Sequence, residues 1–366
     1  MPTFPGKRAI VVAAVLACIA AAVGGWFLYR WHRPWKGARA GTAPEILTHV
    51  PADAPVIAYI DVAALRRLQD SPLTAIVGLA GQNPRQDPDY ENFVRNTGFD
   101  YTRDLDHVAV AFWPSFSLKT TPKGADNRAL AVADGRFDEG KIKAYALRSG
   151  TTITLGERSF YIVPGDPDVA FEFRSPTRMA LASGTDGVRL LSQPDPASRG
   201  GPTEERIDRV AGAPLFAVAR TDNLPASLYE NLRGVPQLQT LARSVRGLVL
   251  AGQPDGEVIH LTLDAECDSM TSALELATVV DSLRLLGSMA LADPKARPQM
   301  TKPQVAFLSA VLNQAQLTHE DRWVRLSLDV TPAMLGEQNA QMRGGRPSKA
   351  SSSKTRIPSL VRALGL

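Results

Sequence analysis

Residues 9–29, AIVVAAVLACIAAAVGGWFLY, form an uninterrupted apolar run without a charged side chain. As a helix with about 1.5 Å rise per residue, this run reaches about 30 Å, the thickness of the hydrocarbon core of a bilayer. Aromatic residues gather at its end and Arg30 follows, as is typical of a membrane interface. The sequence therefore predicts a single transmembrane helix at 9–29 that stays attached, preceded by an N-terminal tail at 1–8.

Two other interpretations of the N-terminus compete with this anchor. Lys7 and Arg8 followed by apolar residues also begin a secretory signal that is cleaved. Cys18 follows Val-Leu-Ala and would be the acceptor in a lipoprotein. The apolar character continues past both cleavage points to Tyr29, which favours the uncleaved anchor.

The sequence features that flank the run disagree about which side of the membrane the body lies on. Two basic residues precede the run and four follow it, and this count by itself favours a cytoplasmic body. The short tail with Lys7-Arg8 and the Gly/Pro-rich stalk at 30–50 favour export instead. We predict a single-pass protein of the bacterial inner membrane with a periplasmic body.

The net charge of +4 hides an uneven distribution. Residues 1–39 and 338–366 together hold 12 basic residues and no acidic one. Removing these 12 from the 41 basic residues leaves 29 against 37 acidic residues, so the body carries about −8. Nucleic-acid binding by the body is disfavoured, because a phosphate backbone requires a positive face, and we predict no nucleic-acid partner. The basic ends match an anionic lipid surface, with the bilayer itself bound through 9–29.

Composition divides the rest of the chain into five segments. The stalk at 30–50 leads into a first α+β repeat at 51–193. Residues 194–209 are rich in Pro, Gly and Ser and form the predicted linker to a second α+β repeat at 210–338. The tail at 339–366 is basic and serine-rich, which predicts disorder. It ends in a short apolar segment, 357–366, that would lie on a membrane, dock into a partner or fray.

The two halves of the body resemble each other. Residues 54–60 (APVIAYI) align with 213–219 (APLFAVA), and the strands predicted at 130–137 and 259–267 each lead into an Asp before a helix. Each half reads β-α-β-β-α-β. We predict an α+β fold: the N-terminal transmembrane helix followed by two tandem βαββαβ, ferredoxin-like repeats with antiparallel sheets. The alternative is that two α+β halves share this order by chance.

Local signals predict several details. Asp138 caps a helix at 138–147, and Asp268 caps the longest helix, 268–291. Gly156-Glu157 connects a hairpin of 153–155 with 160–163. The long helix is apolar on more than one face. We favour its burial in the core over a partner or dimer surface.

Four aspartates follow or end predicted strands: Asp61, Asp134, Asp264 and Asp329. Clustered carboxylates of this kind would bind a metal or work as an acid/base pair. The simpler interpretation, which we favour, is that Asp ends strands and caps helices.

The remaining reactive side chains form no motif. The five histidines have no metal-ligand spacing: His32, His49, His107, His260 and His319. Cys267 is predicted to be a small buried core residue that forms no disulfide with Cys18. The chain has no nucleophile elbow and no phosphate-binding loop. We therefore assign no catalytic, cofactor-binding or metal residue, and no cofactor.

Residues 51–65, PADAPVIAYIDVAAL, follow the apolar run and stalk. This arrangement resembles uncharacterised bacterial membrane-anchored proteins with a single span, in which a PAD-type segment precedes the first strand. The resemblance covers the first third of the chain. It implies an exported body, and it implies no activity and no site.

The leading hypothesis is a non-enzymatic envelope module that binds a protein partner or acts as a scaffold, including as a homo-oligomer. One alternative is an envelope hydrolase that uses the carboxylates at the strand ends. Another is a cytoplasm-facing peripheral module that both basic ends hold at the lipid surface.

Overall fold

The computed structural model describes residues 43–67, 88–113, 128–165, 168–183, 186–193, 201–221, 236–256, 258–292, 302–331 and 334. The predicted tail 1–8, transmembrane helix 9–29 and C-terminal tail 339–366 lie outside these ranges, as do Cys18 and His32. The chain divides into two compact units. Unit 1 comprises Met1–Gly37, Asp70–Ala80 and Ala219–Ala350, and unit 2 comprises Ala38–Gln69, Gly81–Val218 and Ser351–Leu366.

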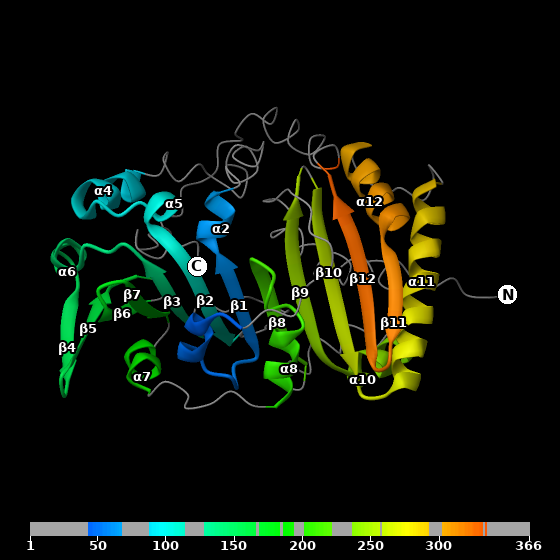
Figure 1. Ribbon diagram of the computed structural model, residues 1–366, viewed down its shortest axis with the longest axis horizontal. Helices are drawn as coiled ribbons and strands as arrows, with labels where there is room; N and C mark the ends of the chain where they lie inside the picture. The colour runs from blue at the N-terminus through cyan, green and yellow to red at the C-terminus, as the bar shows by residue number, and fades with distance from the viewer. Residues whose placement is uncertain are drawn as a thin grey trace. The chain divides into compact units, whose positions relative to one another are not determined.

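Unit 2 holds seven of the described strands (Figure 1). They are β1 (Val56–Asp61), β2 (Leu105–Trp113), β3 (Arg128–Gly135), β4 (Thr151–Leu155), β5 (Arg158–Val163), β6 (Val169–Ser175) and β7 (Arg178–Ser183). Its described helices are the 3₁₀ helix η1 (Glu45–His49) and the α-helices α2 (Val62–Arg66), α4 (Pro88–Thr97), α5 (Tyr101–Asp104), α6 (Glu139–Ala146), α7 (Gly187–Ser192) and α8 (Pro202–Asp208).

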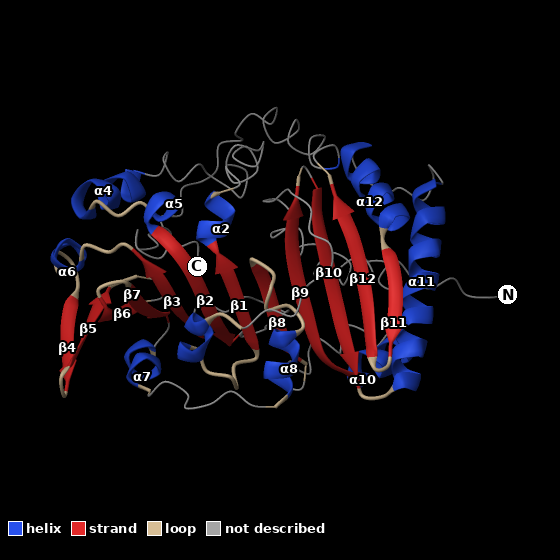
Figure 2. Ribbon diagram, in the orientation of Figure 1, coloured by secondary structure: helices blue, strands red, loops and turns tan. Residues whose placement is uncertain are grey.

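Strand β8 (Leu215–Arg220) spans the division between the units. Unit 1 continues with the strands β9 (Val245–Asp255), β10 (Val258–Cys267), β11 (Gln316–Glu320) and β12 (Trp323–Val330). Its described helices are α10 (Pro236–Ser244), α11 (Met270–Ala292) and α12 (Lys302–Gln314). Figure 2 shows α11 beside β11 and β12, with which it is in contact.

The predicted fold class, an N-terminal transmembrane helix followed by two tandem ferredoxin-like repeats, is wrong. The described strands form a twelve-stranded antiparallel sheet in the order β11-β12-β10-β9-β8-β1-β2-β3-β7-β6-β5-β4. A βαβ unit joins two parallel strands through its helix. Here β1 pairs antiparallel with β2, from Val56 opposite Phe112 to Asp61 opposite His107.

The order of elements along the chain was therefore misleading about how the strands pair. Strands that are neighbours in sequence lie side by side, as β1-β2-β3 in unit 2 and β9-β10 in unit 1. The helices that separate strands pack beside this meander and do not cross it to a parallel strand. A β-α-β-β-α-β order fits either arrangement, because antiparallel neighbours can be joined by connections of any length.

No helix within the described ranges is both long enough and apolar enough to cross a bilayer.

The core of unit 2 is aromatic. Helix α4 presents Tyr90 and Phe93 at helical spacing, and both are buried. Phe93 lies edge-on to Phe99, and Phe171 on β6 stacks on Tyr161 of β5. The side chain of Thr97 donates a hydrogen bond to the carbonyl of Phe93 at 2.8 Å, so its buried hydroxyl is satisfied. Segments that are far apart in sequence are joined by this apolar cluster.

Helix starts follow the capping rules in both units. Asp138 accepts a hydrogen bond from the backbone N–H of Lys141 at 3.0 Å, which confirms the predicted cap of α6. The predicted cap of the long helix is wrong by one residue. Ser269, and not Asp268, accepts from the backbone N–H of Ser272, at 3.1 Å.

The core of unit 1 uses small residues where α11 meets the sheet. Ala273 and Ala277 pack against Cys267 of β10 and Val324 of β12. Small side chains let the helix axis approach the strands closely. Ala273 and Ala277 are the buried residues of α11. The favoured prediction that α11 is buried in the core is therefore correct only for the helix face that carries these two alanines.

Candidate functional site

The four aspartates selected from the sequence separate into two pairs. Asp61 and Asp134 belong to unit 2, and Asp264 and Asp329 belong to unit 1. Asp61 is the N-cap of α2, because its Oδ1 accepts from the backbone N–H of Ala64 at 2.6 Å. The helix-capping interpretation therefore holds for Asp61.

A row of polar residues crosses four neighbouring strands of unit 2. In register, Asp61 of β1 lies opposite His107 of β2, His107 lies opposite Asp134 of β3, and Asp134 lies opposite Arg178 of β7. Nε2 of His107 is 3.8 Å from Oδ1 of Asp61. The strand pairing thus brings together two of the predicted carboxylates and one of the predicted histidines.

Arg178 occupies the end of this row and is fully engaged. Its Nε and Nη2 donate to the two carboxylate oxygens of Asp134 at 2.6 and 2.8 Å, the fork geometry of a strong charge-assisted pair. Its Nη1 donates to Oε1 of Glu45 at 2.9 Å and contacts Nε2 of His49. The η1 helix is thereby fastened to the sheet.

These contacts shift the ionisation of their members. The hydrogen bond and the charge of Arg178 lower the pKa of Glu45 from 4.5 to about 2. The hydrogen bond to Asp134, followed by that to Glu45, raises the pKa of Arg178. Burial, and then the charges of Asp61 and Asp134, raise the pKa of Tyr59. These shifts keep Glu45 and Arg178 charged and Tyr59 neutral at neutral pH, which is characteristic of a structural cluster.

Unit 1 contains the same pair at the equivalent strands. Asp264 of β10 lies opposite Arg325 of β12, as Asp134 of β3 lies opposite Arg178 of β7. Nε and Nη2 of Arg325 donate to the two oxygens of Asp264 at 2.7 and 2.6 Å. Asp264 is buried. Two of the four candidate carboxylates are therefore held by a guanidinium in the same geometry.

Asp329 pairs with a histidine. Nδ1 of His260 is 2.5 Å from Oδ1 of Asp329, and Nε2 of His260 is 3.6 Å from Oδ2 of Asp255. Both ring nitrogens thus face carboxylates. A general base needs one nitrogen directed at a substrate, and this histidine directs neither of its nitrogens into a pocket.

Cys267 is buried beneath α11, as predicted. Burial raises the pKa of its thiol from 9.0 to about 11, and the charges of Asp268 and Glu266 act in the same direction. A buried thiol with a raised pKa is a weak nucleophile at neutral pH. Cys267 is a packing residue.

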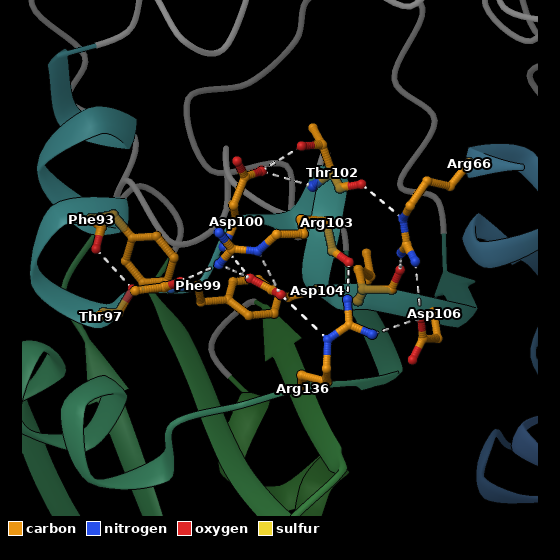
Figure 3. A network of polar contacts seen from close by, with 12 residues as sticks. Arg66, Phe93, Thr97, Phe99, Asp100, Thr102, Arg103, Asp104, Asp106 and Arg136 are labelled. Carbon is orange, nitrogen blue, oxygen red and sulfur yellow. Dashed lines mark hydrogen bonds and ion pairs between the residues drawn. The ribbon is translucent and has the colours of Figure 1, made fainter. Parts of the chain in front are cut away.

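A second polar network surrounds the short helix α5 in unit 2 (Figure 3). Arg103 donates to both oxygens of Asp104, at 2.9 and 2.6 Å, and Nε of Arg136 is 3.4 Å from Asp104. Arg66 donates to the carbonyl of Thr102 at 2.9 Å and to Asp106 at 3.3 Å. This network fixes the turn that leads into β2.

Burial works against the charge of Asp104, but the combined hydrogen bonds and charges of its neighbours outweigh it and lower the pKa. The backbone comes close here as well. A side chain at Gly135 would place its Cβ 2.4 Å from the carbonyl oxygen of Asp104. The mutual saturation of these charges identifies this network as structural.

The most unusual surface within the described residues is that of α11. Its exposed side chains include Met270 (67% exposed), Leu274 (52%), Leu285 (59%), Leu286 (60%) and Met289 (62%). With 3.6 residues per turn, Met270, Leu274, Leu285 and Met289 fall within an arc of about 100°. Exposed apolar residues gathered on one helix face are typical of an interaction surface.

Other kinds of site find little support in the described ranges. There, no group of three or more His, Cys, Asp and Glu side chains is placed to hold a metal ion. An open depression of about 560 Å³ lies along α8, lined by Gly201, Glu204, Glu205, Asp208 and Arg209. It contains none of the candidate carboxylates or histidines.

The chain matches no protein-family model and no curated protein. It is similar to solved structures of TP0453. Crystal form I has 10% sequence identity and a TM-score of 0.40, and covers 82% of this chain and 99% of that chain. Crystal forms III and IV have 12% identity and TM-scores of 0.42 and 0.43, and cover 83% and 82% of this chain and 100% and 96% of theirs. A similarity at this level carries no argument about function.

Sequence reasoning missed Arg178 and Arg325, which hold Asp134 and Asp264. It also missed Glu45, which binds Arg178, and Asp255, which faces His260. One signal was available for two of them. Arg178 and Arg325 lie near the start of the last strand in each half. In each half this strand comes after the repeated aspartate, Asp138 or Asp268, and the helix that follows it. The pairing itself depends on the sheet register, which the sequence does not contain in readable form.

Proposed function

We propose that the protein is a membrane-attached, non-enzymatic module that binds a partner protein on the exposed apolar face of α11. The observation that carries this proposal is the exposure of Met270, Leu274, Leu285 and Met289 on one face. Complete burial of a side chain of this size contributes about 1.5–3 kcal/mol, so a partner that covered this face would gain substantial stability.

The partner that fits this face is an amphipathic helix with a basic flank. Helix α11 is 23 residues long, about 35 Å at 1.5 Å per residue, and its exposed apolar residues lie in two groups, one towards each end, with Thr278 and Asp281 between them on the same arc. Its exposed charged residues Glu275 and Asp281 are acidic, and Arg284 already pairs with Asp281. A helix with Leu or Met at helical spacing and Lys or Arg beside them complements this surface.

The carboxylates argue for this module over a hydrolase. Asp61 caps a helix, Asp134 and Asp264 are each held by an arginine, and Asp329 pairs with His260. Catalytic carboxylates are expected to converge on a pocket with perturbed pKa values. The binding module needs no such convergence.

The proposed location is the bacterial inner membrane, with residues 9–29 as the attachment and the body in the periplasm. The support is the uncharged apolar run itself and the basic residues at both ends of the chain. A reporter that is active only in the cytoplasm, fused to the C-terminus, is expected to be inactive. An active reporter would place the body in the cytoplasm.

Site-specific photocrosslinking tests the binding face. A photoreactive amino acid replaces Leu285 or Leu274 in the full chain in its own membrane. The matched control is Leu147, which is also apolar and exposed but lies outside α11. We expect a protein adduct at Leu274 and Leu285 that Leu147 does not give, with the crosslinked peptide in a Leu- and Lys/Arg-rich helix of the partner.

A second substitution makes the result decisive. Leu285→Glu is exposed and is expected to leave the melting temperature unchanged while it abolishes the adduct formed at Leu274. Adducts to lipid, adducts to a second copy of this chain, or the same adducts at Leu147 contradict the proposal.

A further inference from the structure

Strand β4 is the outermost strand of unit 2 (Figure 1). It pairs with β5 on one side, from Thr151 opposite Ile162 to Leu155 opposite Arg158. All five of its residues, TTITL, are exposed. Among the described strands, none pairs with the other side of β4, which forms a sheet edge.

Protein sheets usually protect such edges with charged residues, proline or a covering element. Strand β4 has no charged residue and no proline, and three of its five residues are threonine. The strand at the other end of the order, β11, contains His319 and Glu320 and contacts α11. Within the described ranges, the edge of β4 thus lacks the charged residues and the helix contact that protect β11.

The hairpin geometry identifies the backbone groups that point outwards. Leu155 and Arg158 close a two-residue turn in which Gly156 has φ +62°, a conformation that favours glycine. In an antiparallel ladder, alternate residues bond the neighbouring strand. If Leu155, Ile153 and Thr151 bond β5, the N–H and C=O groups of Thr152 and Thr154 point away from it.

We propose that β4 pairs antiparallel with β4 of a second copy of this chain, about a two-fold axis at Ile153. This register places Thr152 opposite Thr154 of the second copy, and Thr154 opposite Thr152. The four outward N–H and C=O groups of the two threonines then make four hydrogen bonds across the axis.

The sequence of β4 favours its own copy over an unrelated strand. The threonines at 152 and 154 are symmetric about Ile153, so the edge is self-complementary, as an interface on a two-fold axis must be. No charged side chain is placed opposite a like charge. Ile153 and Leu155 are exposed and lie on one face of the strand. Across the axis, Ile153 lies opposite Ile153 of the second copy and Leu155 lies opposite Thr151.

The contact is small. A five-residue strand buries less than the roughly 1,200 Å² of a stable soluble interface, so pairing in dilute solution is weak. Copies that share one membrane have a high local concentration, which strengthens the contact. The strength of pairing thus rests on the proposed membrane attachment, whereas its geometry is independent of it and of the α11 face.

Disulfide trapping tests this geometry in the full chain. In the proposed register, Ile153 faces Ile153 of the second copy at a non-hydrogen-bonded position, where Cα atoms are about 4.5 Å apart, a distance that a disulfide spans. The variant is Ile153→Cys in a background with Cys18→Ser and Cys267→Ala. The matched control is Thr318→Cys on the edge strand β11, which is also exposed.

Under mild oxidation, in membranes and at high concentration in detergent, Ile153→Cys is expected to form covalent dimers about tenfold faster than Thr318→Cys, because pairing raises the effective concentration of the thiols. Adding Thr154→Pro, which removes an outward N–H, should abolish the difference. In a separate measurement without crosslinking, Ile153→Lys is expected to convert the dimer to monomer in gel filtration at high concentration in detergent, because two lysines would face each other at the axis. Equal crosslinking at 153 and 318, or dimers that persist in these variants, would overturn the proposal. Dimers in detergent without dimers in membranes would support the strand pairing and contradict the proposed membrane attachment.

Discussion

Arg325 donates two parallel hydrogen bonds to Asp264, one to each oxygen of a carboxylate whose side chain is only 2% exposed. The equivalent pair in unit 2, Arg178 and Asp134, has the same geometry, but its carboxylate side chain is 21% exposed. The two pairs differ in the burial of the carboxylate, and Arg178 also binds Glu45. They allow a test of what burial adds to one interaction once the Glu45 contact is removed from the comparison.

Replacing Arg325 with Met should be costly, because the carboxylate of Asp264 stays buried after its guanidinium is removed. Breaking a buried pair in this way costs about 3–5 kcal/mol. Replacing Arg178 with Met should cost less, about 1.5–3 kcal/mol, because water reaches Asp134. Urea unfolding measures both losses, with Arg178→Met made in a Glu45→Gln background so that the ion pair with Glu45 is not counted. Equal losses would show that burial does not set the cost.

Stability should depend on pH through Glu45. Its pKa in the folded protein, about 2, lies below the ordinary value of 4.5, so folding favours the charged form. The pair with Arg178 therefore contributes its full stability above about pH 4.5 and loses it as the pH falls towards 2. Unfolding curves between these pH values should be flatter for Glu45→Gln than for the wild type. Parallel curves would mean that Arg178 does not perturb Glu45.

The start of α11 offers a test of the cap. Ser269→Ala removes the hydroxyl that accepts from the N–H of Ser272 and should cost about 0.5–2 kcal/mol. Asp268→Ala is the matched control and should cost less, because its carboxylate makes only a loose pair with Arg246 at 3.8 Å. A larger loss for Asp268→Ala would restore Asp268 as the cap.

Replacing Gly135 or Gly140 with alanine should change the stability of the protein in opposite directions. Gly135→Ala places a Cβ against the backbone carbonyl of Asp104 and should cost about 1–3 kcal/mol, because backbone has to move. Gly140→Ala in α6 has room, with its closest contact at 3.7 Å, and should stabilise the protein by about 0.4–1 kcal/mol. Thermal denaturation distinguishes the two, and a neutral Gly135→Ala would contradict the close approach.

Local structure could be predicted from the sequence because its determinants are local. The cap at Asp138, the hairpin at Gly156-Glu157 and the burial of Cys267 were all readable from residue type and spacing. The order of the strands was not, because β-α-β-β-α-β is compatible with parallel and antiparallel neighbours alike. Register decides which side chains meet, so the partners of Asp134 and Asp264 were also beyond reach.

The outer face of α11 shows a different limit. A helix that is apolar on more than one face is ordinarily a buried helix. Here burial stops at Ala273 and Ala277, and the leucines and methionines face outwards. Sequence hydrophobicity measures what a side chain prefers. It does not show whether the residues that bury an apolar side chain belong to the same chain or to another molecule.

The reversed order of the last four strands of unit 2 has a consequence for synthesis on the ribosome. Strand β3 pairs with β7, and β6, β5 and β4 follow outwards from there. Arg178 is made 44 residues after its partner Asp134. At about 5–20 residues per second, one edge of β3 waits about 2–9 s for the strand that completes it. During that interval the nascent chain carries an open edge in its middle, so this is the stage at which a chaperone would have most to protect.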